Sequence, residues 1–459
     1  MAEIEEAVEQ EDDAYALDRE TIREVRDAVD AEDRDRLMAA MEPMHPADIA
    51  DLLEQLDESP RHRLIHMLGH DFDGAVLSEL DEGLREDIIR TLSPEVLTGA
   101  VRGLESDDVV DLLEDLEEPQ QEAILEALER PDRIAIERAL SFPDGSAGRL
   151  MQREVVTAPE HWTVGDAIDF MRASLDLPEQ FYHIVLVDPR FRPVGQVTLG
   201  KVMSSDRVTP LKELLEPSYR TIPATQDEED VAYAFNQYHL ISAPVVDEDE
   251  RLVGVITIDD AMTVLSEENE EDLLLLAGVG DESIADRTLQ IAKVRFPWLL
   301  VNLGTAILAS LVIAQFEDVL AAVVALAVLM PIVASMGGNA GTQSMTVAVR
   351  AIATRDLTGS NGWRVVRREV MAGFLNGLAF AVIIGIVSVI WFGSPMLGVV
   401  IAAAMVINLI VAGLAGVLVP ICMDKAGVDP ALASGTFVTT VTDVVGFFAF
   451  LGLAGLVLL

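Results

Sequence analysis

The carboxyl-terminal part of the chain, from residue 298 onward, is dominated by apolar runs that are long enough to cross a lipid bilayer. A membrane-spanning helix needs about 20 mostly apolar residues, and five runs reach that length. Together they predict a five-helix α-helical transmembrane domain over residues 293–459. The expected spans are Trp298–Gln315, Val319–Val349, Val370–Trp391, Met396–Ile421 and Ala431–Leu458.

The second run contains a stretch of unusual composition for the middle of a bilayer, Pro331 to Gln343, which reads PIVASMGGNAGTQ. Every backbone amide must be paired in hydrocarbon, so a proline and three glycines predict a helix that is broken or closely approached by a neighbour. Tight packing of helices through small residues is the alternative. If the stretch lines an ion path, the candidate lining residues are Gly337, Gly338, Asn339 and Gln343.

The fifth run carries Asp443, the only carboxylate well within the five spans as drawn here. A charge at the bilayer centre costs roughly 2.5 to 3.5 kcal/mol and is seldom kept without a partner or a water-filled path. No lysine or arginine of these spans can pair with it, so an ion, a proton or a polar packing contact must compensate. The hydroxyls of Thr436, Thr439 and Thr440 share its helical face, and oxygen ligands of this kind suit Mg2+.

Basic residues between the runs predict the orientation, because loops rich in lysine and arginine stay on the cytoplasmic side. Lys293 and Arg295 precede the first span, five arginines separate the second from the third, and Lys425 separates the fourth from the fifth. We therefore expect a multi-pass protein of the cell membrane with its amino-terminal domains in the cytoplasm and its carboxyl terminus outside. The absence of an earlier apolar run with a basic flank predicts the same location for the soluble part.

Charge is distributed very unevenly along the chain. Residues 291–459 contain 7 acidic and 8 basic side chains of the chain's 78 and 32, so nearly all of the net charge of −46 lies in residues 1–290. This charge disfavours nucleic acid and favours cations as partners. Adaptation to a high-salt cytoplasm explains the same acidic, lysine-poor composition, so charge alone identifies no metal site. A paired nucleophile and base, a phosphate loop and a metal triad are also missing, so we expect no enzyme.

Residues 1–30 are charged and poor in apolar residues, which predicts a disordered start. In residues 31–142 short amphipathic helices repeat, as in HPADIADLLEQLDE from His45 and ESDDVVDLLEDLEE from Glu105. Helical repeats that bury one face by stacking on each other form an all-α superhelical domain.

Residues 143–265 alternate β-branched runs with helical segments, and the pattern occurs twice. PVGQVTLGKVM from Pro193 matches LVGVITIDDAM from Leu252, and each unit predicts helix, strand, strand and helix. The pair resembles a tandem CBS module, an α/β family that joins two units and commonly senses nucleotides or ions.

The second unit keeps two residues that CBS relatives use on an adenosine ribose, Thr257 and Asp260. This resemblance implies a site for ATP at the CBS pair. The first unit departs from the pattern, with Gly200 and Lys201 where the aspartate would fall. A helix cap made by Asp259 or Asp260 explains the same residues without a nucleotide.

Residues 266–292 connect the soluble domains to the first span. The segment opens with SEENEED, which holds five carboxylates, and continues with LLLLAG. It predicts a connecting helix, although a solvated run of charge explains its acidic half equally well.

Over residues 40–459, the domain order and the membrane motifs resemble the MgtE family of magnesium channels. The family's second-span motif, a proline followed by Gly-Gly-Asn-x-Gly-x-Gln, matches residues 331–343, and its fifth-span aspartate matches Asp443. The resemblance implies a homodimer that takes up Mg2+ with its water shell and closes when intracellular Mg2+ binds the acidic cytoplasmic domains. Thr263 and Gly435 depart from the family pattern. The sensor residues that the resemblance implies are Asp259, Asp260, Glu268, Glu271 and Asp429.

Two other functions remain compatible with these residues. A proton-coupled secondary transporter of divalent cations would use Asp443 as its proton carrier. A membrane-tethered nucleotide sensor without transport would use Thr257 and Asp260.

Overall fold

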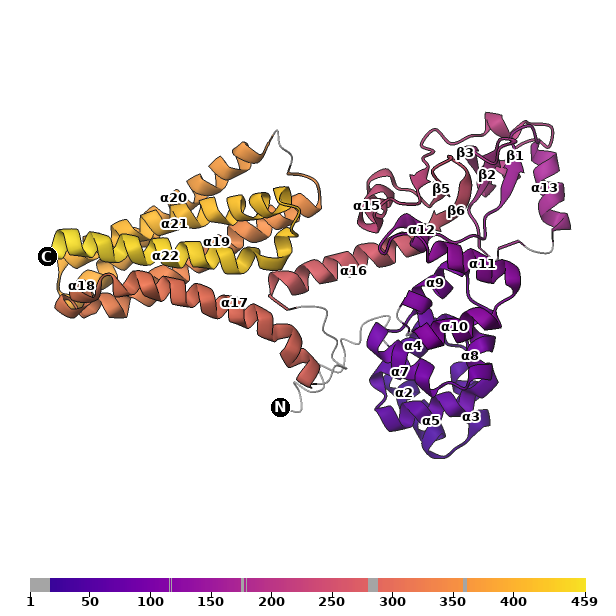
Figure 1. Ribbon diagram of the computed structural model, residues 1–459, viewed down its shortest axis with the longest axis horizontal. Helices are drawn as coiled ribbons and strands as arrows, with labels where there is room; N and C mark the ends of the chain where they lie inside the picture. Colours follow the sequence, from indigo (N-terminus) through magenta and orange to yellow (C-terminus); the bar gives the residue numbers. More distant parts are fainter. Residues whose placement is uncertain are drawn as a thin grey trace. The chain divides into compact units, whose positions relative to one another are not determined.

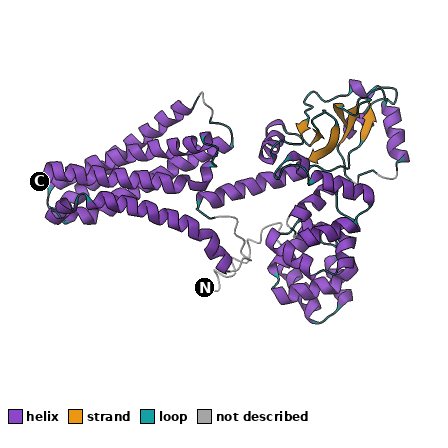
Figure 2. Cartoon of the chain, viewed as in Figure 1, coloured by secondary structure: helices purple, strands orange, loops and turns teal. Residues whose placement is uncertain are grey.

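The computed structural model describes residues 17–459 except 115, 117, 175, 176, 179, 280–287 and 358–360. The chain divides into two compact units, Met1–Glu267 and Glu268–Leu459. The first unit combines helices with two small sheets, whereas the described part of the second is helical (Figures 1 and 2). The architecture is therefore the predicted one of a helical domain, a CBS pair and five membrane-spanning helices.

Short helices packed on a common apolar core make up the amino-terminal domain. Leu37, Leu53, Leu64 and Leu113 are fully buried in it, as stacking repeats require. The helices are α2 (Arg19–Asp30), α3 (Arg34–Met41), α4 (Pro46–Gln55), α5 (Glu58–Leu68), α6 (Ala75–Ser78), α7 (Glu82–Thr91), α8 (Pro94–Val101), α9 (Ser106–Glu114), α10 (Glu118–Ala127) and α11 (Arg130–Ala139).

The helical domain begins earlier than the sequence predicted. α2 lies within residues 1–30, which we expected to be disordered, because Val25, Ala28 and Val29 form a buried stripe and Asp18 caps the first turn. Residues 1–16 lie outside the described residues. The prediction of a disordered start is therefore wrong for residues 19–30.

Each CBS unit contains a three-stranded sheet in which the first strand runs parallel to the second and the second antiparallel to the third. The predicted hairpins are present, whereas the short first strands were missed because two or three residues carry no alternating pattern. The strands are β1 (Thr157–Pro159), β2 (His183–Val187) and β3 (Pro193–Thr198) in one sheet, and β4 (Ile222–Pro223), β5 (Ser242–Val246) and β6 (Leu252–Thr257) in the other. The helices are α12 (Ala147–Leu150), α13 (Val164–Ala173), α14 (Leu199–Ser204) and α15 (Glu228–Tyr238).

A 19-residue helix, α16 (Ile258–Leu276), follows β6 directly. The predicted connecting helix therefore starts earlier than residue 266, inside the second CBS unit. Its acidic residues 267–272 are helical, and part of the predicted connector, residues 280–287, lies outside the described residues.

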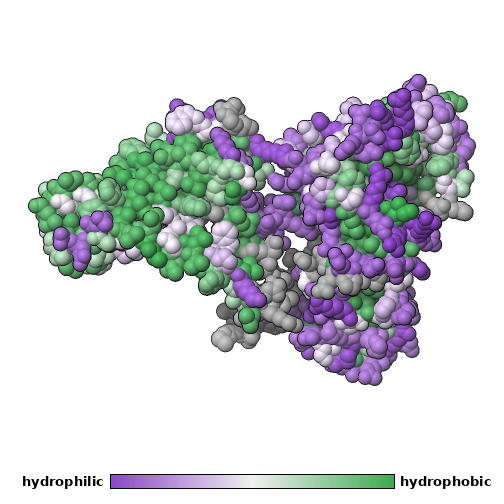
Figure 3. All heavy atoms as spheres, in the orientation of Figure 1, coloured by the Kyte–Doolittle hydropathy of each residue, from purple (hydrophilic) through white to green (hydrophobic). Residues whose placement is uncertain are grey.

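Five helices of the second unit are long and apolar enough to cross a membrane, as predicted. Hydrophobic residues cover most of its visible surface, which suits contact with lipid (Figure 3). α21 is the central helix, because 56% of its apolar 18-residue segment is buried, whereas only 6% of the corresponding segment of α17 is buried. The helices are α17 (Thr288–Ala314), α18 (Glu317–Ala322), α19 (Ala325–Ala353), α20 (Gly362–Phe392), α21 (Pro395–Lys425) and α22 (Pro430–Leu458).

The second span is not broken at its glycines. α19 is helical from Ala325 through Pro331 and all three glycines to Ala353, and the helical run is interrupted instead at Val323 and Val324, between α18 and α19. Pro331 lies inside α19, beyond its first turn, and its missing amide removes one backbone hydrogen bond without ending the helix. The expectation of a broken helix is thus wrong, and that of close approach by neighbouring helices remains.

Candidate ion path and carboxylate clusters

The glycines of α19 lie where α21 and α22 come closest to it. A Cβ atom added at Gly337 would lie 2.2 Å from Asn408 of α21, and one at Gly341 would lie 2.6 Å from Val438 of α22. Real Cβ atoms do not approach other groups this closely, so glycine is required at both positions. A Cβ atom added at Gly338 would lie 3.8 Å from Thr439 Cγ2 of α22. Gly338 and Gly341 of α19 therefore lie beside Thr439 and Val438 of α22.

Asp443 lies on α22, one helical turn beyond Thr439, and its side chain is partly buried. Among the described residues it forms no hydrogen bond and no ion pair. A carboxylate without a protein partner inside a membrane span needs a proton or a ligand from elsewhere. An ion with its water shell meets that need, because hydrated Mg2+ binds proteins through one or two carboxylates.

The threonine hydroxyls beside Asp443 donate their protons locally and keep oxygen lone pairs free. Thr439 Oγ1 donates to the Gly435 carbonyl at 2.9 Å, and Thr440 Oγ1 donates to the Thr436 carbonyl at 2.6 Å. Thr436 instead donates to Asn302 Oδ1 of α17 at 2.9 Å. The threonine face can therefore accept hydrogen bonds from a hydrated cation.

Polar side chains form an exposed stripe along α19. Ser335, Asn339, Thr342 and Thr346 follow at spacings of four, three and four residues, and all four are exposed. Gln343 is exposed beside them. A polar stripe on a membrane-spanning helix is not stable against lipid, so another protein surface or water must cover it.

Carboxylates crowd together where the helical domain meets the second CBS unit. Burial raises the pKa of Asp107 well above its usual value, and the charges of Asp260 and Asp108 raise it further. Burial also raises the pKa of Asp260 to about 7, with added repulsion from Asp259 and Asp108. Thr257 Oγ1 donates to Asp260 Oδ2 at 2.6 Å, which fits a cap at the start of α16.

A second group of carboxylates lies in the membrane unit, where α16 ends. Leu275 and Leu276 of α16 pack against a core that includes Met345 of α19 and Val438 of α22. One turn earlier on α16, burial and the charge of Asp429 raise the pKa of Asp272. The end of the acidic helix is thereby in contact with both helices of the candidate ion path.

The chain matches three family models in the predicted order. The MgtE intracellular N domain matches residues 44–145, CBS domains match 147–207 and 211–267, and the MgtE model, described as a divalent cation transporter, matches 330–453. The magnesium transporter MgtE of Bacillus subtilis (strain 168) is 31% identical over 402 residues, which cover 87% of this chain and 89% of that protein. The chain belongs to the MgtE family. The magnesium transporter MgtE of Thermus thermophilus is 36% identical over 68% of this chain and 70% of its own.

Among solved structures, the cytosolic domain of the Mg2+ channel MgtE in complex with ATP is similar to this chain. It is 29% identical and covers 53% of this chain and 99% of its own, with a TM-score of 0.49.

In this member of the MgtE family the predicted sensor residues do not form one metal cluster. No group of three or more histidine, cysteine, aspartate or glutamate side chains in the described parts of the chain could hold a metal ion. Asp429 caps α22 by accepting a hydrogen bond from the Ala431 amide at 2.7 Å. Glu268 is partly buried, whereas Asp259 and Glu271 are exposed.

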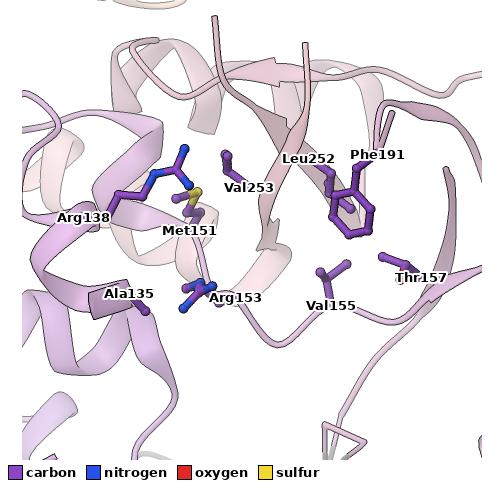
Figure 4. A pocket seen from close by; sticks show the side chains of 9 residues that line it. All are labelled: Ala135, Arg138, Met151, Arg153, Val155, Thr157, Phe191, Leu252 and Val253. Carbon is purple, nitrogen blue, oxygen red and sulfur yellow. The ribbon is translucent and has the colours of Figure 1, made fainter. Parts of the chain in front are cut away.

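Of the two predicted nucleotide residues, Thr257 lines a cavity of only about 20 Å³, and Asp260 is not part of its lining. A nucleotide needs a pocket of roughly 300 Å³ or more. A cavity of about 300 Å³ occurs elsewhere in the first unit, with Arg138 and Arg153 at one end and Phe191 at the other (Figure 4). The predicted residues therefore mark a helix cap in this conformation.

Three residues near the candidate path were missed in the sequence. Glu369 of α20 accepts a hydrogen bond from Ser344 at 3.1 Å, and its side chain is 15% exposed. The sequence prediction missed Glu369 because the third span was expected to begin one residue later, at Val370. Asp272 could not be distinguished in the sequence from the four other carboxylates of the same segment. Asn408 could have been identified, because it is an isolated polar residue in a long apolar run.

Proposed function

We propose that this protein is a homodimeric Mg2+ channel for magnesium uptake, closed by intracellular Mg2+. The observation that carries the proposal is Asp443, a membrane-embedded carboxylate without a partner in the described chain, beside threonine oxygens and opposite Gly338. Its charge attracts a divalent cation, and the water shell of Mg2+ bridges to the threonine oxygens and carbonyls around it. The named relatives are magnesium transporters, which supports Mg2+ as the transported ion.

The exposed polar stripe of α19 supports a homodimer. Asn339 and Gln343 would be exposed to lipid in a monomer, at a high cost in hydrogen bonding. A second copy related by twofold symmetry would cover the stripe with its equivalent and bring two Asp443 carboxylates to one axis. The path would then be lined by polar groups from both subunits.

Repulsion between carboxylates supports gating by Mg2+. Burial raises the pKa of Asp107, Asp260 and Asp272, and each is also raised by a neighbouring carboxylate. An ion that binds between such pairs stabilises the arrangement in which they are close. Mg2+ therefore shifts the equilibrium toward closure by its differential affinity for the closed state.

The orientation follows from the flanking charges, with the amino-terminal unit in the cytoplasm. On this basis the Mg2+ that closes the path is intracellular, and closure is negative feedback on uptake. The sensor residues are Asp260 with Asp259, and Glu268, Glu271 and Asp429 at the end of α16 and the start of α22.

Flux into vesicles that contain the purified full-length protein tests the ion path. We expect Mg2+ entry with the unmodified protein, and entry at the level of protein-free vesicles with Asp443→Asn, which keeps the shape but removes the charge. Asp318→Asn, at an exposed carboxylate of α18, is the matched control and should conduct normally. Normal Mg2+ entry through a folded Asp443→Asn protein would overturn the proposal.

Two further measurements separate a channel from the proton-coupled alternative. Single-channel currents carried by Mg2+ and entry that persists without a pH gradient are expected of the channel. Entry that stops when the gradient is collapsed, with no unitary current, would identify a secondary transporter that uses Asp443 as its proton carrier.

ATP at the CBS pair is a separate part of the proposal, supported by the Thr257 and Asp260 motif. Binding requires the Thr257–Asp260 hydrogen bond to open, since the adjoining cavity is about 20 Å³. Titration of the full-length protein with ATP, with Thr257→Val as the comparison, measures it. Equal affinity of the two proteins would contradict a nucleotide site at this position.

A further inference from the structure

Asn408 is a polar residue in the centre of the membrane unit. It lies midway along α21, and its exposed fraction is 0%. An amide side chain buried in hydrocarbon costs free energy unless its donors and acceptor are used. Polar residues inside membrane spans usually have a structural or functional role.

The side chain of Asn408 reaches into the contact between three helices. Its Nδ2 donates to the Val333 carbonyl of α19 at 2.8 Å. A Cβ atom at Gly337 of α19 would lie 2.2 Å from this nitrogen, and one at Gly446 of α22 would lie 2.8 Å from it. Two glycines on two different helices thus leave the space that one amide fills.

The position of this contact relates it to the candidate ion path. Gly337 immediately precedes Gly338, which lies against Thr439, and Gly446 follows Asp443 by three residues. Asn408 Oδ1 has no hydrogen-bond partner among the described residues. Packing alone would be served at lower cost by leucine, which has the same shape without an unsatisfied acceptor.

We propose that Asn408 is a positioning residue that sets the spacing between α19 and α22, and through it the discrimination among divalent cations. Selectivity in an ion path depends on the distance between its ligands, and the Asn408 bond fixes α19 at the level of Asp443. Because this role depends on the proposed path between α19 and α22, the Asp443→Asn protein belongs in the same experiment.

The test compares Mg2+ and Ca2+ entry into vesicles that contain the full-length protein. Asn408→Leu keeps the volume and removes the hydrogen bond, and Asn408→Ala removes both. We expect each to change the ratio of Mg2+ to Ca2+ entry at least about fivefold, the factor that corresponds to one unsatisfied buried group. Ser388→Ala is the matched control, because Ser388 of α20 is also 0% exposed and without a hydrogen-bond partner in the described chain. Its ratio should equal that of the unmodified protein.

A double-variant cycle tests the geometry itself. Gly446→Ala places a methyl group against Asn408 and should reduce Mg2+ entry, whereas the same change in the Asn408→Ala background should reduce it less, because the clash is gone. Equal effects in the two backgrounds would show that Asn408 does not fix α22.

The outcomes separate this inference from the proposed path. Mg2+ entry that survives Asp443→Asn overturns the path, and the role of Asn408 with it. Entry that stops in Asp443→Asn, together with an unchanged cation ratio in both Asn408 variants, leaves the path intact and overturns the positioning role. If neither Asn408 variant folds, Asn408 is a packing residue and the positioning role is overturned.

Discussion

Asp272 of α16 and Asp429, the cap of α22, lie close enough that the charge of Asp429 raises the pKa of the Asp272 carboxyl, after the larger effect of burial. Both residues lie outside the membrane-spanning segments. Repulsion between the two carboxylates therefore opposes the contact between the end of α16 and the start of the helix that carries Asp443, and a cation between them would relieve it. This repulsion makes the pair a direct test of gating.

Asp272→Asn should weaken closure by Mg2+. The change removes the repulsion and one of the two carboxylates that a bridging ion would use, so we expect the Mg2+ concentration for half closure to rise about fivefold or more. Patch recordings at internal Mg2+ from zero to millimolar levels measure it. Glu270→Gln, at an exposed carboxylate of the same helix, is the control. The same half-closing concentration in Asp272→Asn and the unmodified protein would exclude the pair from gating.

The stability of the first unit should fall as the pH rises from about 4 to about 7 in the absence of divalent ions. Asp260, with a pKa of about 7, and Asp107, whose pKa is also raised, bind protons more tightly when folded than when unfolded. A carboxyl group with a raised pKa in the folded state stabilises the protein at low pH, and this stabilisation is lost as the pH rises through the folded-state pKa. For such shifts the free energy of unfolding should fall by roughly 2 to 4 kcal/mol. The apparent melting temperature at pH 5 and pH 8 measures the loss.

Asp107→Asn should raise the melting temperature more at pH 8 than at pH 5, because burial raises the pKa of the native carboxyl and its charge is costly only where it is ionised. Added Mg2+ should then stabilise the unmodified protein more than the variant. Glu42→Gln, at an exposed carboxylate of the same domain, controls for net charge. A variant that behaves alike at both pH values would rule out a buried charge at Asp107.

The fold was largely predictable from the sequence because its signals are long. Runs of about 20 apolar residues cannot be buried in a small soluble domain, so five spans followed directly. The course of α19 was not predictable, because a proline and glycines indicate a break or a close contact equally well. The answer depends on Asn408 and Val438, which lie opposite these glycines and far away in the sequence.

The candidate site was predictable where one residue stands out from its surroundings. Asp443 is a lone charge in a span, and its threonine face follows from helical spacing. Asp272 lies among five similar carboxylates, and only the packing of α16 shows which of them faces Asp429. The pairing of Asp107 with Asp260 requires the contact between the helical domain and the CBS unit, which no local pattern encodes.

Gly416→Ala should destabilise the membrane unit. A Cβ atom at Gly416 would lie 2.6 Å from the Gly341 carbonyl oxygen and 2.7 Å from Ser344 Cβ, and the backbone of α19 cannot move aside without disturbing the path. Overpacking of this kind costs about 1 to 3 kcal/mol. Gly304→Ala on α17 is the matched control, since nothing lies within 4 Å of its added Cβ. Monodispersity in detergent after heating compares the two, and equal survival would show that α19 and α21 are not in contact here.

Thr436→Val should reduce Mg2+ entry by releasing α17 from α22. The Thr436 hydroxyl donates to Asn302 Oδ1 at 2.9 Å, and valine keeps the shape but loses this bond, which is worth about 1 kcal/mol. Asn302→Ala should cause a similar fall, and the double variant should fall no further, because both changes remove the same bond. Thr305→Val on α17 is the control, since its hydroxyl donates to a backbone carbonyl of its own helix, that of Asn302, at 2.8 Å. Additive losses in the double variant would mean that the two residues act separately and that this bond does not hold α17 beside the path.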